Sequence, residues 1–175
     1  MALADSARSL REEFDRAFAL PPALPAPGSV NLLTIRIGAE PYAIRLADIR
    51  GLHADRRILA VPSPLPELLG VTNFRGQIVP VYQLGALLGK PATTIAPRWM
   101  VLVQASAPLA LAFEAFESHL CASAGQLIAS ADLAGHERPC EAVHTGDGVV
   151  PVLAVSALAA QIEARTARTS PGPPG

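Results

Sequence analysis

GVTNFRGQIVPVYQL, residues 70–84, holds the pattern that decides the fold. Two runs of strand-forming residues, one ending at Phe74 and the next beginning at Gln77, are separated only by Arg75 and Gly76. A two-residue connection requires positive φ at one or both positions, and glycine adopts positive φ without a steric clash. The stretch therefore predicts a β-hairpin that presents the Arg75 side chain outward at its tip.

Similar strand patterns lie on both sides of this hairpin. VNLLTIRI and YAIRL flank a GAEP turn within residues 30–46, and WMVLVQA and LALAFEAF flank a short turn within residues 99–116. Alternating apolar residues bounded by turn residues are typical of half-buried strands. Pro80 cannot donate a ladder hydrogen bond, so its strand is expected at a sheet edge or bulged there. GVVPVLAV, residues 148–155, repeats the Val-Pro-Val step of residues 79–81 and hints at two similar β units.

Helices are expected at both ends of the chain. Apolar residues three and four positions apart predict an amphipathic helix over residues 1–20, which either packs on its own domain or docks on another protein. Consecutive prolines make residues 21–29 a semi-rigid linker. A last helix, capped by Ser156, is expected before a disordered tail at residues 166–175.

The composition excludes several classes of protein. Half of the 175 residues are hydrophobic, while 17 prolines and 13 glycines argue against a helical bundle. A formal net charge of −1 provides no basic field for nucleic acid. The sequence shows no signal peptide, and its apolar stretches fall short of the roughly 20 residues that span a bilayer. Two cysteines without CxxC spacing suit a reducing compartment, so we expect a cytoplasmic protein with no membrane insertion.

One cluster contains residue types that bind zinc. His136, Cys140 and His144 are spaced by four residues and Cys121 lies upstream, which supplies the thiolate and imidazole ligands that zinc prefers. Pro139 breaks the helix that would bring three of them to one face, so we expect no metal and no cofactor. No base or positively charged group that would activate a thiol lies near Cys121 in the sequence, and both cysteines are interpreted as small buried residues. A small zinc- or thiol-dependent enzyme remains the less favoured alternative.

A longer series of motifs begins at Tyr42. YAIRLADIRGL is followed by ILAVP, then by GVTNFRG, and then by IVPVYQL with a glycine-ended helical turn. This order resembles the CheW family of chemotaxis coupling proteins, most strongly over residues 32–89. The resemblance implies an all-β domain over residues 30–165, built of two side-by-side SH3-like five-stranded β-barrels in lobes of roughly 30–95 and 96–165. The N-terminal helix and a short C-terminal helix would be additions to it.

The resemblance also implies a non-catalytic signalling adaptor. Members of the family couple the cytoplasmic tip of a methyl-accepting chemoreceptor to the regulatory domain of a CheA-type histidine kinase, so these are the expected partners. An outward arginine suits a carboxylate or carbonyl of a partner. We expect a partner-binding surface that includes or is shaped by seven residues: Arg75, Asp48, Leu46, Arg50, Gly70, Asn73 and Gly76.

Some of these residues have a second interpretation from chemistry alone. Asn73 is expected to hold the turn through bonds to the backbone. Asp48, at an acidic position of the family, is expected to pair with one of the arginines that follow it: Arg50, Arg56 or Arg57. Gly70 is expected to act on binding only indirectly, as a core or turn residue.

The chain departs from the family pattern at several positions. Gln83 stands where the family usually has Asp, whereas the Phe113–Glu114 step keeps the carboxylate of an apolar-acidic pair. VLAVSALAA, residues 152–160, replaces a late leucine-aspartate segment. These departures leave open an adaptor in a different kinase pathway, or a scaffold that dimerises through the N-terminal helix.

Overall fold

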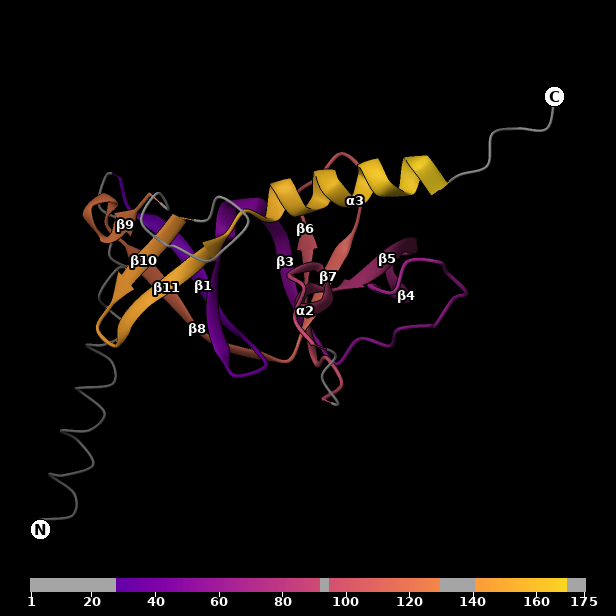
Figure 1. Cartoon of the computed structure of the whole chain (residues 1–175), viewed down its shortest axis with the longest axis horizontal. Helices are drawn as coiled ribbons and strands as arrows, with labels where there is room; N and C mark the ends of the chain where they lie inside the picture. Colours follow the sequence, from indigo (N-terminus) through magenta and orange to yellow (C-terminus); the bar gives the residue numbers. More distant parts are fainter. Residues whose placement is uncertain (1–27, 92–94, 130–140, 170–175) are drawn as a thin grey trace, which may run out of the picture.

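A computed structural model of the chain describes residues 28–91, 95–129 and 141–169 (Figure 1). The predicted N-terminal helix, all but the last two residues of the proline-rich linker, and residues 170–175 of the predicted tail lie outside the described residues. So do His136 and Cys140 of the cluster that was weighed as a zinc site.

The described residues are mostly in β-strands, as the sequence predicts. The strands are β1 Val30–Ile37, β2 Glu40–Arg45, β3 Ile49–Ala54, β4 Leu68–Phe74, β5 Gln77–Gln83, β6 Trp99–Val103, β7 Ala110–Phe113, β8 Ala115–Ala122, β9 Leu127–Ile128, β10 Glu141–Thr145 and β11 Gly148–Leu153. The helical segments are η1 Leu46–Asp48, α2 Leu84–Leu87, η2 Ala124–Gln126 and α3 Val155–Thr169.

The strands form two sheets that lie side by side (Figure 1). Sheet one has the order β8-β1-β2-β11-β10-β9, and sheet two has the order β3-β6-β7-β5-β4. The all-β fold class is thus confirmed. Sheet two has the expected five strands, whereas sheet one gains a sixth, the two-residue β9. Among the described residues, the end strands of neither sheet pair with each other, so the pairing shows no barrel closure.

The centres of the two sheets are built alike. In sheet one the β1–β2 and β10–β11 hairpins meet through parallel pairing of β2 with β11. In sheet two the β6–β7 and β4–β5 hairpins meet through parallel pairing of β7 with β5. The two Val-Pro-Val steps therefore occupy equivalent strands, β5 and β11, which supports the two similar units that the repeated step indicates.

The strand that comes directly after the β1–β2 hairpin, and the one that comes directly after the β6–β7 hairpin, each pair in the other sheet. β3 follows the β1–β2 hairpin but pairs with β6 in sheet two, and β8 follows the β6–β7 hairpin but pairs with β1 in sheet one. Sheet one consequently takes its strands from residues 30–45, 115–128 and 141–153, and sheet two takes its strands from residues 49–83 and 99–113. The chain does not divide near residue 95 into two consecutive lobes. The end strand of sheet one, β8, follows a hairpin of sheet two, and the end strand of sheet two, β3, follows a hairpin of sheet one.

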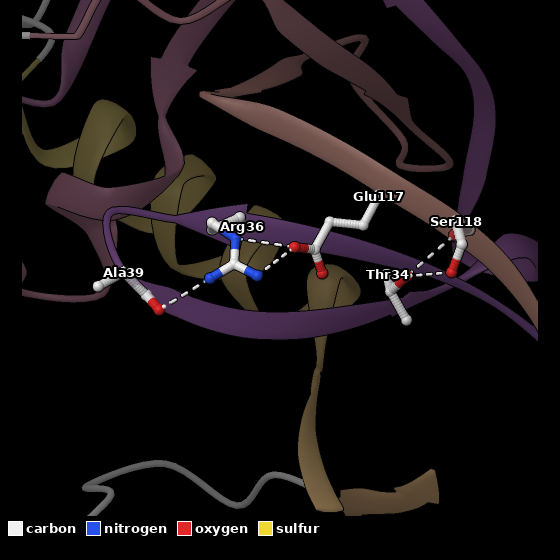
Figure 2. Close-up of polar contacts among 5 residues, drawn as sticks. All are labelled: Thr34, Arg36, Ala39, Glu117 and Ser118. Carbon is white, nitrogen blue, oxygen red and sulfur yellow. Dashed lines mark hydrogen bonds and ion pairs between the residues drawn. The ribbon is translucent and has the colours of Figure 1, made fainter. Parts of the chain in front are cut away.

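Side chains reinforce the attachment of the crossing strand β8 to β1 (Figure 2). The Thr34 and Ser118 hydroxyls are 2.7 Å apart, and the Arg36 guanidinium binds the Glu117 carboxylate and donates to the Ala39 carbonyl at 3.1 Å. The β1–β8 register skips Glu117 between Ser118 and the next paired residue, which is a β-bulge. A bulge bends a strand and re-aims a side chain, here toward Arg36.

Pro80 does not lie in an edge strand, so the first of the two expectations for it is wrong, whereas the β4–β5 pairing does carry a bulge close by, between Leu68 and Gly70. β5 runs between β4 and β7 in sheet two, and Pro80 lies opposite Val71. The backbone N–H and C=O of Val71 both bond to Leu59, so no bond from Pro80 is required there. Pairing with β7 begins only at Val81, one residue later. An interior strand therefore carries this proline without losing a ladder bond.

Three apolar clusters form the core. One lies between the two sheets and is shared, one belongs to sheet one, and one belongs to sheet two. Helix α3 packs on the shared cluster through one face: Val155, Leu158, Ala159 and Ile162. The Arg165 guanidinium binds the carboxylate of buried Glu67, which ties α3 to the segment before β4.

The C-terminal helix differs from its prediction at both ends. It extends to Thr169, so the first four residues of the predicted disordered tail are helical, and the Thr166 hydroxyl donates to the Ile162 carbonyl at 2.9 Å. Ser156 lies inside the first turn and not at the cap, because the Leu158 N–H already bonds to the Ala154 carbonyl at 3.1 Å. Packing on the shared core extends the helix beyond the residues that local signals identify.

Gly70→Ala should destabilise the fold by roughly 2–4 kcal/mol. Gly70 has a φ of 145°, and an added Cβ would lie 2.1 Å from the Leu59 carbonyl oxygen, so backbone would have to move. Gly125→Ala is the matched control, since nothing lies within 4 Å of its added Cβ. Urea unfolding of both variants measures the difference; equal stability of the Gly70 and Gly125 variants would show that the close approach is absent.

Candidate partner-binding surfaces

The β4–β5 turn has the geometry that the sequence predicts. Arg75 and Gly76 both have positive φ, 51° and 86°, which is the pattern of a type I′ hairpin turn. The Asn73 side-chain oxygen accepts a hydrogen bond from the Gly76 N–H at 2.8 Å, so Asn73 holds the turn as expected. Arg75 is exposed and makes no ion pair with any described residue.

The side chains of Arg56 and His53 both contact the ring of Phe74, the last residue of β4 before this turn. The Arg56 guanidinium lies 5.3 Å from the centre of the Phe74 ring, and the His53 ring lies 4.6 Å from that ring on a tilted plane. Burial lowers the pKa of His53 below its ordinary value, and the charges of Arg56 and Arg75 lower it further. At neutral pH the positive charge of this surface is therefore carried by the arginines.

Asp48 lies at a different place, where sheet one meets α3. It ends the short helix η1 and lines a hollow of ≈ 380 Å³ whose other lining residues are Arg45, Glu141, Val152, Leu153, Ala154 and Ser156. Burial raises the pKa of Asp48, the Arg45 charge opposes this rise, and the Glu141 charge adds to it. Leu46, at the other end of η1, is exposed.

Asp48 does not pair with the arginines expected for it. Arg50 occupies a bulge of β3 and donates from Nε to the Gln104 side-chain oxygen at 3.2 Å, and Arg56 lies over the Phe74 ring. The cation that acts on Asp48 is Arg45, which itself binds the Glu141 carboxylate. Arg45 also lies close to Asp48 in sequence, but before it, whereas Glu141 is brought to this hollow by long-range strand pairing.

The seven predicted residues fall into separate groups. Arg75, Asn73 and Gly76 form the tip of a hairpin in sheet two, while Leu46 and Asp48 lie at the junction of sheet one with α3. Arg50 lies in the bulge at the start of β3. Gly70 is buried under Leu59 and Ala60, so it shapes the surface without being part of it. Their contact with a partner stays a prediction.

The metal-site residues that the structure describes are not brought together. Cys121 lies on β8 and His144 on β10, and strands β1, β2 and β11 separate these two strands. Cys121 is exposed, so the expectation of a buried thiol there is wrong. Within residues 28–91, 95–129 and 141–169 no group of three metal-binding side chains occurs. No helix in this part of the chain is long and apolar enough to cross a membrane.

Sequence reasoning missed the hollow and the exposed aliphatic residues beside the hairpin. Arg45 and Glu141 are 96 positions apart in sequence, and no local signal links them. The exposure of Ile78 could have been predicted from the sequence. Side chains alternate between the two faces of a strand, so Ile78 points to the face opposite to that of the buried residues Val79 and Val81.

The comparisons with known proteins agree with the fold. Residues 31–163 match the model of the CheW-like domain. A relative described as "Probable chemotaxis protein CheW", from Rhizobium etli, is 31% identical over 78 residues, which cover 44% of this chain and 50% of the relative. The chain thus spans about half the length of this curated relative. The crystal structure of the scaffolding protein TtCheW from Thermoanaerobacter tengcongensis is similar with a TM-score of 0.66 at 16% identity, over 74% of this chain and 91% of that chain.

Asp48→Asn should raise the free energy of unfolding at neutral pH. The pKa of Asp48 is raised in the folded state, so folding favours the protonated carboxyl, and ionisation costs stability as the pH rises through the folded pKa. The gain from Asn should therefore disappear when the pH falls below the ordinary value of 3.8. Urea unfolding at about pH 7 and about pH 3 measures it. Asp147→Asn, at an exposed turn, is the control, and a loss of stability at neutral pH in Asp48→Asn would contradict the argument.

Proposed function

Because this chain belongs to the CheW-like domain family, we propose that it is a non-catalytic signalling adaptor in the cytoplasm. It would couple the cytoplasmic tip of a methyl-accepting chemoreceptor to the regulatory domain of a CheA-type histidine kinase. The observation that carries the proposal is the family match over residues 31–163, which includes both crossing strands.

The described relatives support the same class of function. The Rhizobium etli relative is named as a chemotaxis protein, and the solved structure is that of a scaffolding protein. Neither description names a reaction. Within the described residues no observation favours the zinc- or thiol-dependent alternative, since Cys121 and His144 lie on separated strands.

An adaptor requires two separate surfaces on one rigid body, and two features of the fold support this requirement. The Arg75 tip belongs to sheet two, and the hollow beside Asp48 belongs to sheet one and the start of α3. The crossing strands and α3 join the two sheets, so a partner on one surface would be held at a fixed position relative to a partner on the other. Such an arrangement supports coupling of one bound protein to another.

Arg75 is the residue on which a first test should act. Its guanidinium has five donors in a planar fork, and no described side chain forms an ion pair with it. Replacing an interface arginine by a carboxylate removes the donors and adds repulsion to any acidic partner group. Losses of about 2–5 kcal/mol are typical when a paired interfacial charge is disrupted.

Co-sedimentation with a receptor signalling fragment and a kinase regulatory domain, added singly and together, tests the proposal. We expect a ternary complex with the wild-type chain and a loss of at least about tenfold in affinity for one partner in Arg75→Glu. Arg168→Glu, which makes the same charge change in the last turn of α3, should bind like the wild type.

Two outcomes would contradict the proposal. Failure of the wild-type chain to bind either protein would remove the adaptor function. Normal formation of the ternary complex by Arg75→Glu would leave the function standing but would remove Arg75 from the interface. Thermal unfolding of both arginine variants shows beforehand that the charge changes leave the fold intact.

A further inference from the structure

The two end strands of sheet two meet through side chains. In the described part of the chain β3 pairs only with β6, and β4 pairs with β5 and with Leu59, so no backbone pairing joins β3 to β4. The centres of the His53 ring on β3 and the Phe74 ring at the end of β4 are nevertheless 4.6 Å apart. His53 lies opposite Met100, which belongs with Phe74 to the apolar cluster of sheet two. The sheet therefore curls until its two ends touch.

The contact of residues 53–59 with β4 is named the seam, and its inner end is hydrogen-bonded. The Leu59 N–H donates to the Val71 carbonyl at 2.8 Å, and the Val71 N–H donates to the Leu59 carbonyl at 2.9 Å. Next along β4, the Thr72 hydroxyl donates to the Arg57 carbonyl at 2.8 Å. No hydrogen bond from this described segment reaches the last residue of β4. The outer end of the seam, beside the β4–β5 turn, is therefore held by side-chain packing.

The backbone around His53 fixes where its ring lies. A Cβ added at Gly51, on the same face of β3, would lie 3.0 Å from His53 Nε2, so the glycine leaves the space that the imidazole occupies. Asp55 has a φ of 53°, in the left-handed region that aspartate tolerates, and it turns the chain toward Arg56. Arg98 donates two hydrogen bonds to the Asp55 carboxylate, at 3.0 and 3.2 Å, which holds this turn.

The charges that act on His53 are positive. The Arg56 guanidinium lies 5.3 Å from the centre of the Phe74 ring, so it shares this ring with the imidazole. Arg75 stands in the turn that follows Phe74. The carboxylate nearest in sequence is already paired with Arg98. Burial lowers the pKa of His53 below its ordinary value of 6.5, and the charges of Arg56 and Arg75 lower it further.

Protonation of His53 works against the outer end of the seam. The neutral imidazole packs against the Phe74 ring without bringing a charge to it. An imidazolium can also bind a ring face, but this ring already carries Arg56, so a second cation meets repulsion. The folded chain favours the neutral form, so the contribution of His53 to the free energy of unfolding is complete above pH 6.5. It is lost as the pH falls through the lower pKa of the folded state.

We propose that His53 is a pH-sensitive latch on the seam of sheet two. The neutral imidazole holds Phe74 and closes the two ends of the sheet on each other. The imidazolium releases Phe74, so the outer end of the β4–β5 hairpin opens in acid while the rest of the domain stays folded. The inference goes beyond the proposed function, because the latch acts within this chain and needs neither partner.

Hydrogen exchange measured by NMR on the full chain tests the latch. It is recorded at about pH 7.5 and about pH 5, since histidine changes its charge between these values. After correction for intrinsic exchange rates, the protection of amides in residues 72–78 should fall by about threefold or more at the lower pH, because the seam opens locally. Amides in residues 142–150, on the equivalent hairpin of sheet one, should keep their protection.

Three variants assign the effect to His53. His53→Phe keeps a ring beside Phe74 and removes the titration, so it should keep the hairpin protected at both pH values. His144→Gln, which removes an exposed histidine of the equivalent hairpin, should lose protection in acid like the wild type. Arg56→Gln should raise the pKa of His53, measured from the shifts of its ring protons, because one of the charges that lower this pKa is removed.

Several results would overturn the latch while the adaptor function stands. One is equal protection of the wild-type hairpin at both pH values, and another is a loss in acid that persists in His53→Phe. An equal loss over residues 142–150 also overturns it, since the whole domain and not the seam would then respond to acid. An unchanged pKa of His53 in Arg56→Gln would contradict release by charge repulsion.

Discussion

The exchange of β3 and β8 between the two sheets is the constraint on which the rest of the structure depends. The end strand of each sheet is the one that follows a hairpin of the other sheet in the chain. Both of these crossing strands carry a bulge near the point where they cross. The shared cluster between the sheets then buries residues of both, and α3 covers it. Without β8, one side of β1 would have no hydrogen-bonded neighbour, and the same holds for β6 without β3. The two surfaces considered for partners are thereby fixed relative to each other.

Both candidate surfaces contain groups that do not help the fold. The pKa of Asp48 is raised by burial, so its ionised form costs stability at neutral pH. Leu59 and Ile78 expose most of their aliphatic side chains to water, although an interior of this size could bury such residues. Exposed apolar residues that gather in a patch mark interaction sites more often than single exposed residues do. These local costs are understandable if the residues contact partners.

The sequence predicted the elements much better than their pairing. The β4–β5 hairpin followed from Arg75 and Gly76, and Asn73 was correctly expected to hold the turn, because such signals act within four residues. The crossing of β3 and β8 could not be predicted from alternation, since a strand has the same pattern in either sheet. Pro80 was expected at an edge or a bulge because it cannot donate a ladder bond, although the hydrogen bonds of Val71 to Leu59 permit it inside a sheet. Asp48 was expected to pair with arginines that follow it in sequence, whereas the cation that acts on it is Arg45, which precedes it, and long-range pairing brings Glu141 to the same hollow.

If the exchange makes the sheets one cooperative unit, hydrogen exchange measured by NMR reveals it most directly. The slowest amides of β1, in sheet one, and of β6, in sheet two, should exchange with the same free energy, equal to that of global unfolding. A partner bound to either surface would then be held by the stability of the whole domain. A clearly lower free energy of exchange in one sheet than in the other would contradict this account, because it would show that a sheet opens while its exchanged strand stays in place.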